Sequence, residues 1–376
     1  MLGKTPPMGW NSWNTFGPAV NEQIVLETAD AMAEKGYLEA GYEYVVIDDC
    51  WMMPQRVDGK LVVNPEKFPH GMKYVGDYIH SKGLKFGIYS AAGTLTCQGL
   101  PGSFGHEYED AQMFADWGVD YLKYDLCHFP GCGDIRTSYL TMSMALRATG
   151  RDIMFAACPV GQGEPHKWMR SVGAHLYRST GDINDCFESF RNNAMSQFRK
   201  LDTNAPGCFN DIDMLVVGMG GQGHVSYNNG CTNYEYLMHF ALWCLFGAPL
   251  MMGCDVRNVS DEIRDILQNK ELIRIDQDEE CRPPYYEDKQ RYAFDARLSF
   301  IKLLSNNELL VCFFNFDGEP HWTPFYMDDY GIPSATGCGL ELTDILTGET
   351  LPVIHDGWNP TLPGHTFHIY KAKLVK

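Results

Sequence analysis

The sequence predicts an α/β protein: a (β/α)8 TIM barrel followed by a C-terminal antiparallel β-sandwich domain. Two observations predict the barrel. Eight short apolar segments recur between residues 8 and 252, and stretches of helical periodicity separate them. A third observation predicts the second domain, because after about residue 284 the chain changes to short strand-like runs separated by turns. We therefore expect the barrel over residues 1–283 and the β domain over residues 284–376.

The eight segments are short and rich in apolar, aromatic and β-branched residues, which favour strands. They are Met8–Trp10, Tyr44–Ile47, Lys85–Tyr89, Tyr121–Tyr124, Ile153–Ala156, His175–Arg178, Asp213–Leu215 and Pro249–Met252. Four of the helical patterns between them stop at a glycine shortly before the next strand, at Gly36, Gly83, Gly118 and Gly150. This alternation predicts a parallel sheet with helices outside it.

The last part of the chain has a hairpin pattern. Phe300–Leu304 and Leu309–Phe314 are apolar runs on either side of the turn Ser305–Glu308. Thr366–Tyr370 is a further apolar run near the end of the chain, and we expect it to form the closing strand of the β domain.

Composition excludes several classes of partner. The net charge of -18 argues against nucleic acid and anionic membrane surfaces. No apolar run reaches membrane-spanning length, and the first residues lack the apolar core of a secretory signal. We expect a cytoplasmic protein, or a secreted one if a signal peptide has been removed. The thirteen cysteines include no CxxC pair, which predicts mostly free thiols and no structural zinc. The acidic surface permits a homo-oligomer without indicating one.

Carboxylates gather at the predicted C-terminal ends of the strands, where barrel enzymes place their active sites. They are Asp48, Asp49, Asp125, Asp182 and Asp213, with the cations Lys123 and Arg178 and the aromatic residues Trp13, Trp51, Tyr89 and Tyr177 nearby. A single Asp after a strand is commonly a cap or turn residue. Capping does not require five of them at one end, so the pattern favours a carboxylate-lined, aromatic-walled pocket for a sugar.

Paired carboxylates carry out glycoside hydrolysis, and in retaining enzymes they lie about 5–5.5 Å apart. We expect Lys123 to keep Asp125 ionised as the nucleophile. Burial and a neighbouring carboxylate should raise the pKa of Asp182, so that it donates a proton to the leaving oxygen and then acts as general base. The same carboxylates could hold Mg²⁺ or Mn²⁺ in a sugar lyase or isomerase, but Lys123 would compete with the metal, and we expect neither metal nor cofactor. A non-catalytic carbohydrate-binding barrel is a further alternative, against which the presence of both Asp125 and Asp182 argues.

Nine motifs together resemble glycoside hydrolase family 27, which holds α-galactosidases and α-N-acetylgalactosaminidases. They are Thr5–Trp13, Ile47–Trp51, Phe68–Gly71, Gly87–Ser90, Pro101–Ser103, Lys123–Asp125, Arg178–Ile183, Asn210–Met214 and Ile275–Asp278. The resemblance covers essentially the whole chain. It implies a retaining exo-α-galactosidase that removes terminal α-galactose from oligosaccharides or glycoconjugates without a cofactor.

The resemblance also implies a role for individual residues. Asp125 matches the family's nucleophile and Asp182 its acid/base. The matching substrate-binding residues are Asp48 and Asp49 for the 4- and 6-hydroxyls, Lys123 and Arg178 for other hydroxyls, Trp13 and Tyr89 as walls, and Asp213 and Met214 at the rim. Cys97 and Cys127 fall where the family often has a disulfide beside the active site.

The chain departs from the family pattern after the fifth strand. Many α-galactosidases carry a Cys-Glu-Trp run there that binds the sugar 2-hydroxyl, whereas here Cys158 is followed by Pro159 and Val160 and two glycines open space. We count Cys158 among the substrate-binding residues. An α-N-acetylgalactosaminidase therefore stays an alternative. A β-L-arabinopyranosidase is another, because its sugar lacks the hydroxymethyl group that Asp48 and Asp49 would contact.

Overall fold

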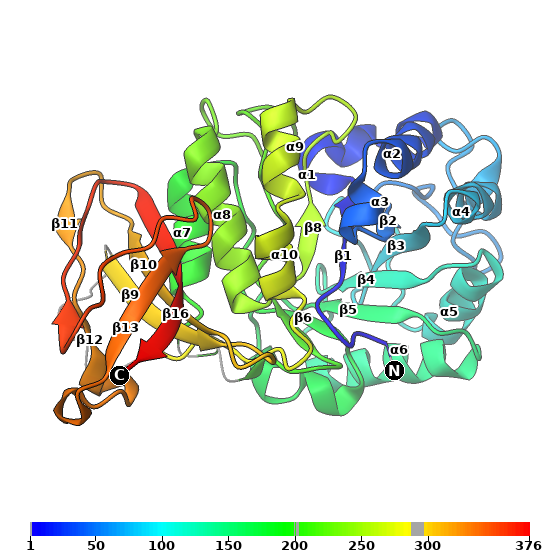
Figure 1. The fold of residues 1–376 in the computed structure, drawn as a ribbon. Coiled ribbons are helices and arrows are strands. Elements are labelled where there is room, and N and C mark those ends of the chain that lie inside the picture. Colours follow the sequence, from blue (N-terminus) through cyan, green and yellow to red (C-terminus); the bar gives the residue numbers. More distant parts are fainter. Residues whose placement is uncertain (1, 199, 201–202, 287–296) are drawn as a thin grey trace.

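The structure is a computed structural model that describes residues 2–198, 200, 203–286 and 297–376. A barrel with helices around it forms the larger part, and the C-terminal strands pack at one side of it, against the helices labelled α7 and α8 (Figure 1). None of the described helices is both long enough and apolar enough to span a membrane.

Eight parallel strands form the barrel wall, in the order β7-β6-β5-β4-β3-β2-β1-β8. They are β1 (Met8–Asn11), β2 (Tyr44–Val46), β3 (Lys85–Ala91), β4 (Tyr121–Asp125), β5 (Met154–Cys158), β6 (Leu176–Arg178), β7 (Phe209–Asp211) and β8 (Leu250–Met252). A single parallel bridge between Leu215 and Met252 joins the two ends of this sheet. The predicted (β/α)8 barrel is confirmed.

Helices follow the strands on the outside of the barrel. They are α1 (Trp13–Phe16), α2 (Glu22–Glu34), α3 (Tyr37–Ala40), α4 (Gly71–Ser81), α5 (Glu107–Asp116), α6 (Ile135–Ala148), α7 (Phe187–Met195), α8 (Asn233–Phe246), α9 (Asp261–Leu267) and α10 (Lys270–Asp276). The four predicted stop glycines, Gly36, Gly83, Gly118 and Gly150, all have positive φ values between 73° and 83°. This left-handed conformation ends a helix and is readily adopted only by glycine.

The predicted position of the seventh strand is wrong. We expected Asp213–Leu215, but the strand is β7, Phe209–Asp211. Asp213 has φ +83°, so it cannot continue a strand. The strand was not recognised because two of its three residues, Asn210 and Asp211, are polar. We expected the apolar Leu215 to be part of the strand instead, but it forms only the bridge to Met252.

The C-terminal part is built from antiparallel sheets. A four-stranded sheet has the order β13-β16-β10-β9, with β9 (Arg297–Leu303), β10 (Leu309–Asn315), β13 (Gly339–Asp344) and β16 (Thr366–Val375). Two small sheets pair β11 (His321–Trp322) with β15 (Thr361–Leu362), and β12 (Phe325–Tyr326) with β14 (Gly357–Trp358). Leu303 lies opposite Leu309, which confirms the predicted hairpin, and β16 includes the predicted closing strand.

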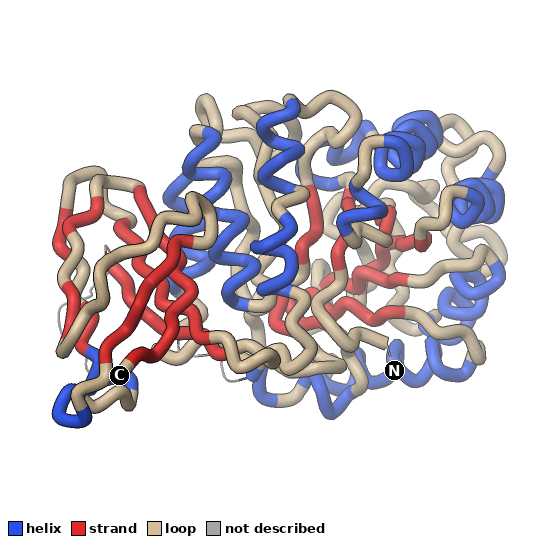
Figure 2. Tube along the Cα trace, in the orientation of Figure 1, coloured by secondary structure: helices blue, strands red, loops and turns tan. Residues whose placement is uncertain are grey.

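Side chains on the two faces of β10 pack against different parts of the molecule. Leu310, Cys312 and Phe314 belong to the same apolar core as the barrel helices, whereas Val311 and Phe313 pack with the small sheets. Helix α8 is apolar on all sides and lies between the barrel strands and the four-stranded sheet (Figure 2). A helix that is apolar all round needs cover on both sides, and here the barrel and the sheet provide it.

Candidate active site

Every residue predicted for catalysis or substrate binding lines one cavity of about 310 Å³ at the C-terminal ends of the barrel strands. They are Trp13, Asp48, Asp49, Tyr89, Lys123, Asp125, Cys158, Arg178, Asp182, Asp213 and Met214. Two nearby aromatic residues do not line it. Trp51 is buried and donates to the Tyr89 carbonyl, and the Tyr177 hydroxyl is hydrogen-bonded to the Thr203 hydroxyl.

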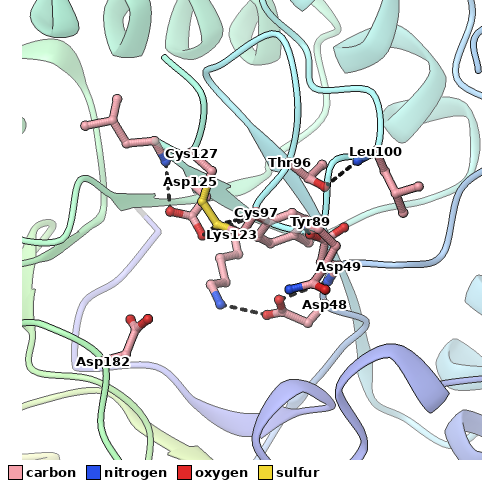
Figure 3. Close-up of a disulfide and its surroundings, with 12 residues drawn as sticks. Asp48, Asp49, Tyr89, Thr96, Cys97, Leu100, Lys123, Asp125, Cys127 and Asp182 are labelled. Atoms are coloured by element: carbon pink, nitrogen blue, oxygen red, sulfur yellow. Dashed lines mark hydrogen bonds and ion pairs between the residues drawn. A yellow bond between two sulfur atoms is a disulfide. The ribbon is translucent and has the colours of Figure 1, made fainter. Parts of the chain in front are cut away.

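Asp48 is a buried carboxylate that two neighbouring side chains hold in place. It follows β2, is 2 % exposed, and its Oδ2 accepts hydrogen bonds from Asn11 Nδ2 at 2.7 Å and from Lys123 Nζ at 2.8 Å (Figure 3). Burial is the largest single effect on the pKa of Lys123 and lowers it, but Asp48, Cys158 and Asp125 together outweigh burial, so the pKa is raised. Lys123 is therefore a fixed cation whose ion-pair partner is Asp48 rather than Asp125. Asn11, the last residue of β1, was missed because the predicted cluster at the strand ends consisted of carboxylates, cations and aromatic residues.

Asp125 is the last residue of β4 and is 8 % exposed. Tyr89 donates its hydroxyl to Asp125 Oδ2 at 3.2 Å, and the backbone N–H of Leu126 donates to Oδ1 at 2.8 Å. Burial raises the pKa of Asp125, and the charge of Lys123 and the Leu126 hydrogen bond oppose this effect. Lys123 acts in the expected direction by favouring the ionised form of Asp125, but the opposing effect of burial is larger.

Asp182 has an environment opposite to that of Asp125. Its side chain is 81 % exposed, and Arg178 donates to its Oδ1 at 2.8 Å. The predicted burial of Asp182 is therefore wrong, and the residue is open to solvent and to an incoming substrate. Arg178 is itself buried and also pairs with Asp213. Burial raises the pKa of Asp213 to about 6, with Arg178 opposing the shift.

The loop after β3 supplies the wall beside Asp125. A disulfide joins Cys97 to Cys127, two residues after the nucleophile candidate (Figure 3). The backbone N–H of Gln98 donates to Asp49 Oδ2 at 3.2 Å. Burial raises the pKa of Asp49, against hydrogen bonds from Thr96 and backbone groups. The disulfide thus connects the loop that hydrogen-bonds to Asp49 to the residues just after β4, which ends in Asp125.

Several lining residues were not among the predicted site residues, and most of them lie in loops. They are Asn14 in α1 and, outside the helices and strands, Gln98, Ile183, Asn184, His224 and Val225. His224 makes an edge contact with Trp13, with ring centroids 4.8 Å apart. Loop residues have no periodic pattern. For His224 and Val225, the one available signal was the glycine-rich run that precedes them.

Comparison with known proteins agrees with this geometry. A family model described as alpha galactosidase A matches residues 5–278. The chain belongs to this family. Its predicted membership of glycoside hydrolase family 27 is thereby confirmed, and the match covers the whole barrel.

Individual members of the family are similar over long stretches. An α-galactosidase of Cyamopsis tetragonoloba is 46 % identical over 279 residues, which is 74 % of this chain and 65 % of the relative, slightly less than two thirds of its length. The crystal structure of α-galactosidase I from Mortierella vinacea is 32 % identical, has a TM-score of 0.87 and covers 99 % of this chain and 97 % of its own. The structure of a Saccharomyces cerevisiae α-galactosidase with raffinose is 27 % identical, has a TM-score of 0.86 and covers 100 % and 98 %.

Proposed function

We propose that this chain is a retaining exo-α-galactosidase that hydrolyses terminal α-D-galactose from oligosaccharides or glycoconjugates. One observation carries the proposal: a buried carboxylate and an exposed one line the same cavity, Asp125 from β4 and Asp182 from the segment after β6 (Figure 3). Family membership and the raffinose-bound relative support it.

The two environments fit the two roles of a double displacement. Asp125, held by Tyr89 and the Leu126 N–H, attacks the anomeric carbon and forms the glycosyl-enzyme. Asp182 donates a proton to the departing oxygen and then removes a proton from the water that hydrolyses the intermediate. Its exposure lets it take up the first proton from solvent and lets the leaving group and the water pass in turn.

The remaining lining groups fit a hydroxylated ring. Asp48 and Asp49 would accept hydrogen bonds from sugar hydroxyls, and Lys123, already fixed by Asp48, would donate one. Trp13, backed by His224, offers an apolar face to the ring. A neutral sugar needs such directional contacts rather than a net charge on the protein.

The donor set of the cavity favours a reaction without metal. Among the described residues, the one group of three His, Cys, Asp or Glu side chains close enough to share a metal ion is Cys97, Asp125 and Cys127, and the disulfide uses both thiols. We expect full activity in the presence of EDTA.

A second candidate is an α-N-acetylgalactosaminidase. Cys158 lines the cavity, but none of the residues Pro159–Gly163 that follow it does. This run therefore offers no group that would require a hydroxyl on the second carbon of the sugar. The β-L-arabinopyranosidase alternative differs at the other end of the ring, near Asp49.

A kinetic comparison tests the proposal. We would measure kcat/KM for the para-nitrophenyl derivatives of α-galactose, α-N-acetylgalactosamine and β-L-arabinopyranose with one preparation of the protein. We expect the α-galactoside to be preferred. Asp125→Ala should abolish its turnover without loss of folding, whereas Asp116→Ala, on the exposed side of α5, should match the wild type. An active Asp125→Ala variant would contradict the proposal.

We further propose a cytoplasmic location, which the many free cysteines support. Seven of them are buried as small apolar side chains: Cys50, Cys158, Cys208, Cys244, Cys254, Cys281 and Cys312. The Cys97–Cys127 disulfide is the feature that a reducing compartment would challenge. Fractionation of the source cells, followed by an activity assay of each fraction, would decide the location.

A further inference from the structure

Asp211 lies directly beneath the active site and has no role assigned so far. It is the last residue of β7. It faces a small cavity of about 20 Å³ inside the barrel, which it shares with Asn11, Lys123, Arg178 and Asp213 among others. A carboxylate among two cations of the site can act on the site without touching the substrate.

The hydrogen bond of Asp211 is made to the backbone of the next acidic residue. Its Oδ1 accepts the N–H of Asp213 at 2.8 Å. Asp213 has φ +83°, a conformation that a residue with a side chain rarely adopts and that needs support from its surroundings. The Asp211 carboxylate supports it from below, and Trp243 Nε1 donates to the Asp213 carbonyl at 2.7 Å.

The turned backbone at Asp213 aims its carboxylate at Arg178. Asp213 Oδ2 accepts from Arg178 and from the N–H of Ile183 at 2.7 Å. Arg178 in turn donates to Asp182 at 2.8 Å. Among the described residues, Arg178 is the one hydrogen-bond partner of the Asp182 side chain, which is otherwise surrounded by solvent. The orientation of Asp182 therefore depends on that of Arg178.

We propose that Asp211 is a positioning residue for the acid/base, acting through the Asp213 turn and Arg178 on Asp182. This inference rests on the proposed function, because it takes Asp182 as the group that protonates the leaving oxygen.

Substrates with different leaving groups can show whether Asp211 positions the acid/base or has only a general structural role. A poor leaving group such as the glucose of melibiose needs a proton from Asp182, whereas 2,4-dinitrophenolate departs without one. Loss of acid/base alignment should therefore slow melibiose hydrolysis far more than dinitrophenyl α-galactoside hydrolysis. Damage to folding or to galactose binding would slow both equally.

The experiment compares kcat/KM on these two substrates for four variants. We expect Asp211→Ala to lose at least tenfold more on melibiose than on the dinitrophenyl galactoside, in the same sense as Asp182→Asn. Asp211→Asn should stay within about threefold of the wild type, because its Oδ1 can still accept the Asp213 N–H. Asp255→Ala serves as the matched control, since Asp255 is also an acid just beyond a strand end that fixes a local turn, and it should leave the ratio unchanged.

Two results would overturn the inference: equal losses on both substrates in Asp211→Ala, or an Asp211→Asn variant as impaired as Asp211→Ala. Should Asp211→Ala not fold, Asp211→Val gives the same comparison with a residue that favours the strand. A wild-type protein that cleaves neither substrate would instead refute the proposed function, and the two failures are therefore distinguishable.

Discussion

Lys123 and Asp48 form a 2.8 Å ion pair in which the carboxylate is almost completely buried. Such a pair gains little over an apolar substitute, but breaking it leaves a buried charge without a partner. Asp125, which lines the same cavity, has its pKa raised by burial instead. These two buried carboxylates thus differ because Lys123 forms its ion pair with Asp48 rather than with Asp125, and sequence spacing alone does not reveal this.

The pH dependence of activity follows from Asp125. The nucleophile must be ionised, and burial raises its pKa above the ordinary value of 3.8. Activity is therefore present above the raised pKa and is lost as the pH falls through it. We expect the acid limb of kcat/KM against pH, measured with para-nitrophenyl α-galactoside, to lie above the ordinary carboxyl pKa of 3.8. An acid limb at or below the ordinary value would contradict the burial of Asp125.

The Lys123–Asp48 pair makes a separate prediction about stability. Lys123→Met should lower the free energy of unfolding by about 3 kcal/mol, because Asp48 is left buried and unpaired. Adding Asp48→Asn to this variant should restore much of the loss, since the amide carries no charge. Urea unfolding of the wild type, both single variants and the double variant measures the coupling. A double variant as unstable as the sum of the two single ones would show that the pair is not coupled.

Helix ends were more predictable than loop geometry. The four stop glycines were identified because a left-handed residue after a helix is a local event that the residue type itself signals. The left-handed turn at Asp213 was missed because its residue type does not signal it: the Asp213 N–H donates to Asp211, and its carbonyl accepts from the distant Trp243. The exposure of Asp182 was also missed, because residue type does not show the path of the segment after β6, which leaves the side chain in solvent.

The disulfide makes a prediction for the β3–α5 loop and β4. Reduction of Cys97–Cys127 should lower kcat/KM several-fold. The loop in which the Gln98 N–H donates to Asp49 would then no longer be linked to the end of β4, where Asp125 lies. Treatment with a dithiol, followed by the galactoside assay, measures the effect, and reoxidation should reverse it.

Matched variants separate this disulfide from other thiol effects. Cys97→Ser with Cys127→Ser should reproduce the reduced activity and become insensitive to the dithiol. Cys132→Ser should behave as the wild type, because Cys132 is a free and exposed cysteine. Full activity of the doubly substituted protein would show that the disulfide does not support the site.

On the scale of the whole molecule, barrel and β domain share one apolar core. Phe300 of β9 packs with Phe246 of α8 and with Phe198, at ring-centroid distances of 6.4 Å and 6.3 Å. Arg274 of α10 pairs with Glu308, in the loop between β9 and β10, at 2.6 Å. The sequence indicated two domains from the change in periodicity, but periodicity does not show which faces meet. The boundary at residues 283 and 284 remains our proposal.

The shared core predicts that the barrel depends on the β domain. A chain ending at residue 283 should aggregate or lack activity, because the outer face of α8 would lose Phe300, Phe314 and their neighbours and would be exposed to water. Size-exclusion chromatography and the galactoside assay, with the full chain as control, check this. A monomeric and fully active chain of residues 1–283 would contradict it.

The closure of the barrel has a consequence for how the protein moves. Between β7 and β8 the wall is joined by the single bridge from Leu215 to Met252, whereas every other pair of neighbouring strands shares at least two residue pairs in register. Asp213 lies next to this seam, whereas Asp125 is in register with Ala91 on the continuous wall and Asp48 follows β2. Amide protons near Leu215 should therefore exchange with solvent earlier than those of β3 and β4. The nucleophile candidate would thus lie on the more rigid wall, whereas Asp213, which pairs with the Arg178 that contacts Asp182, would lie beside the more mobile seam.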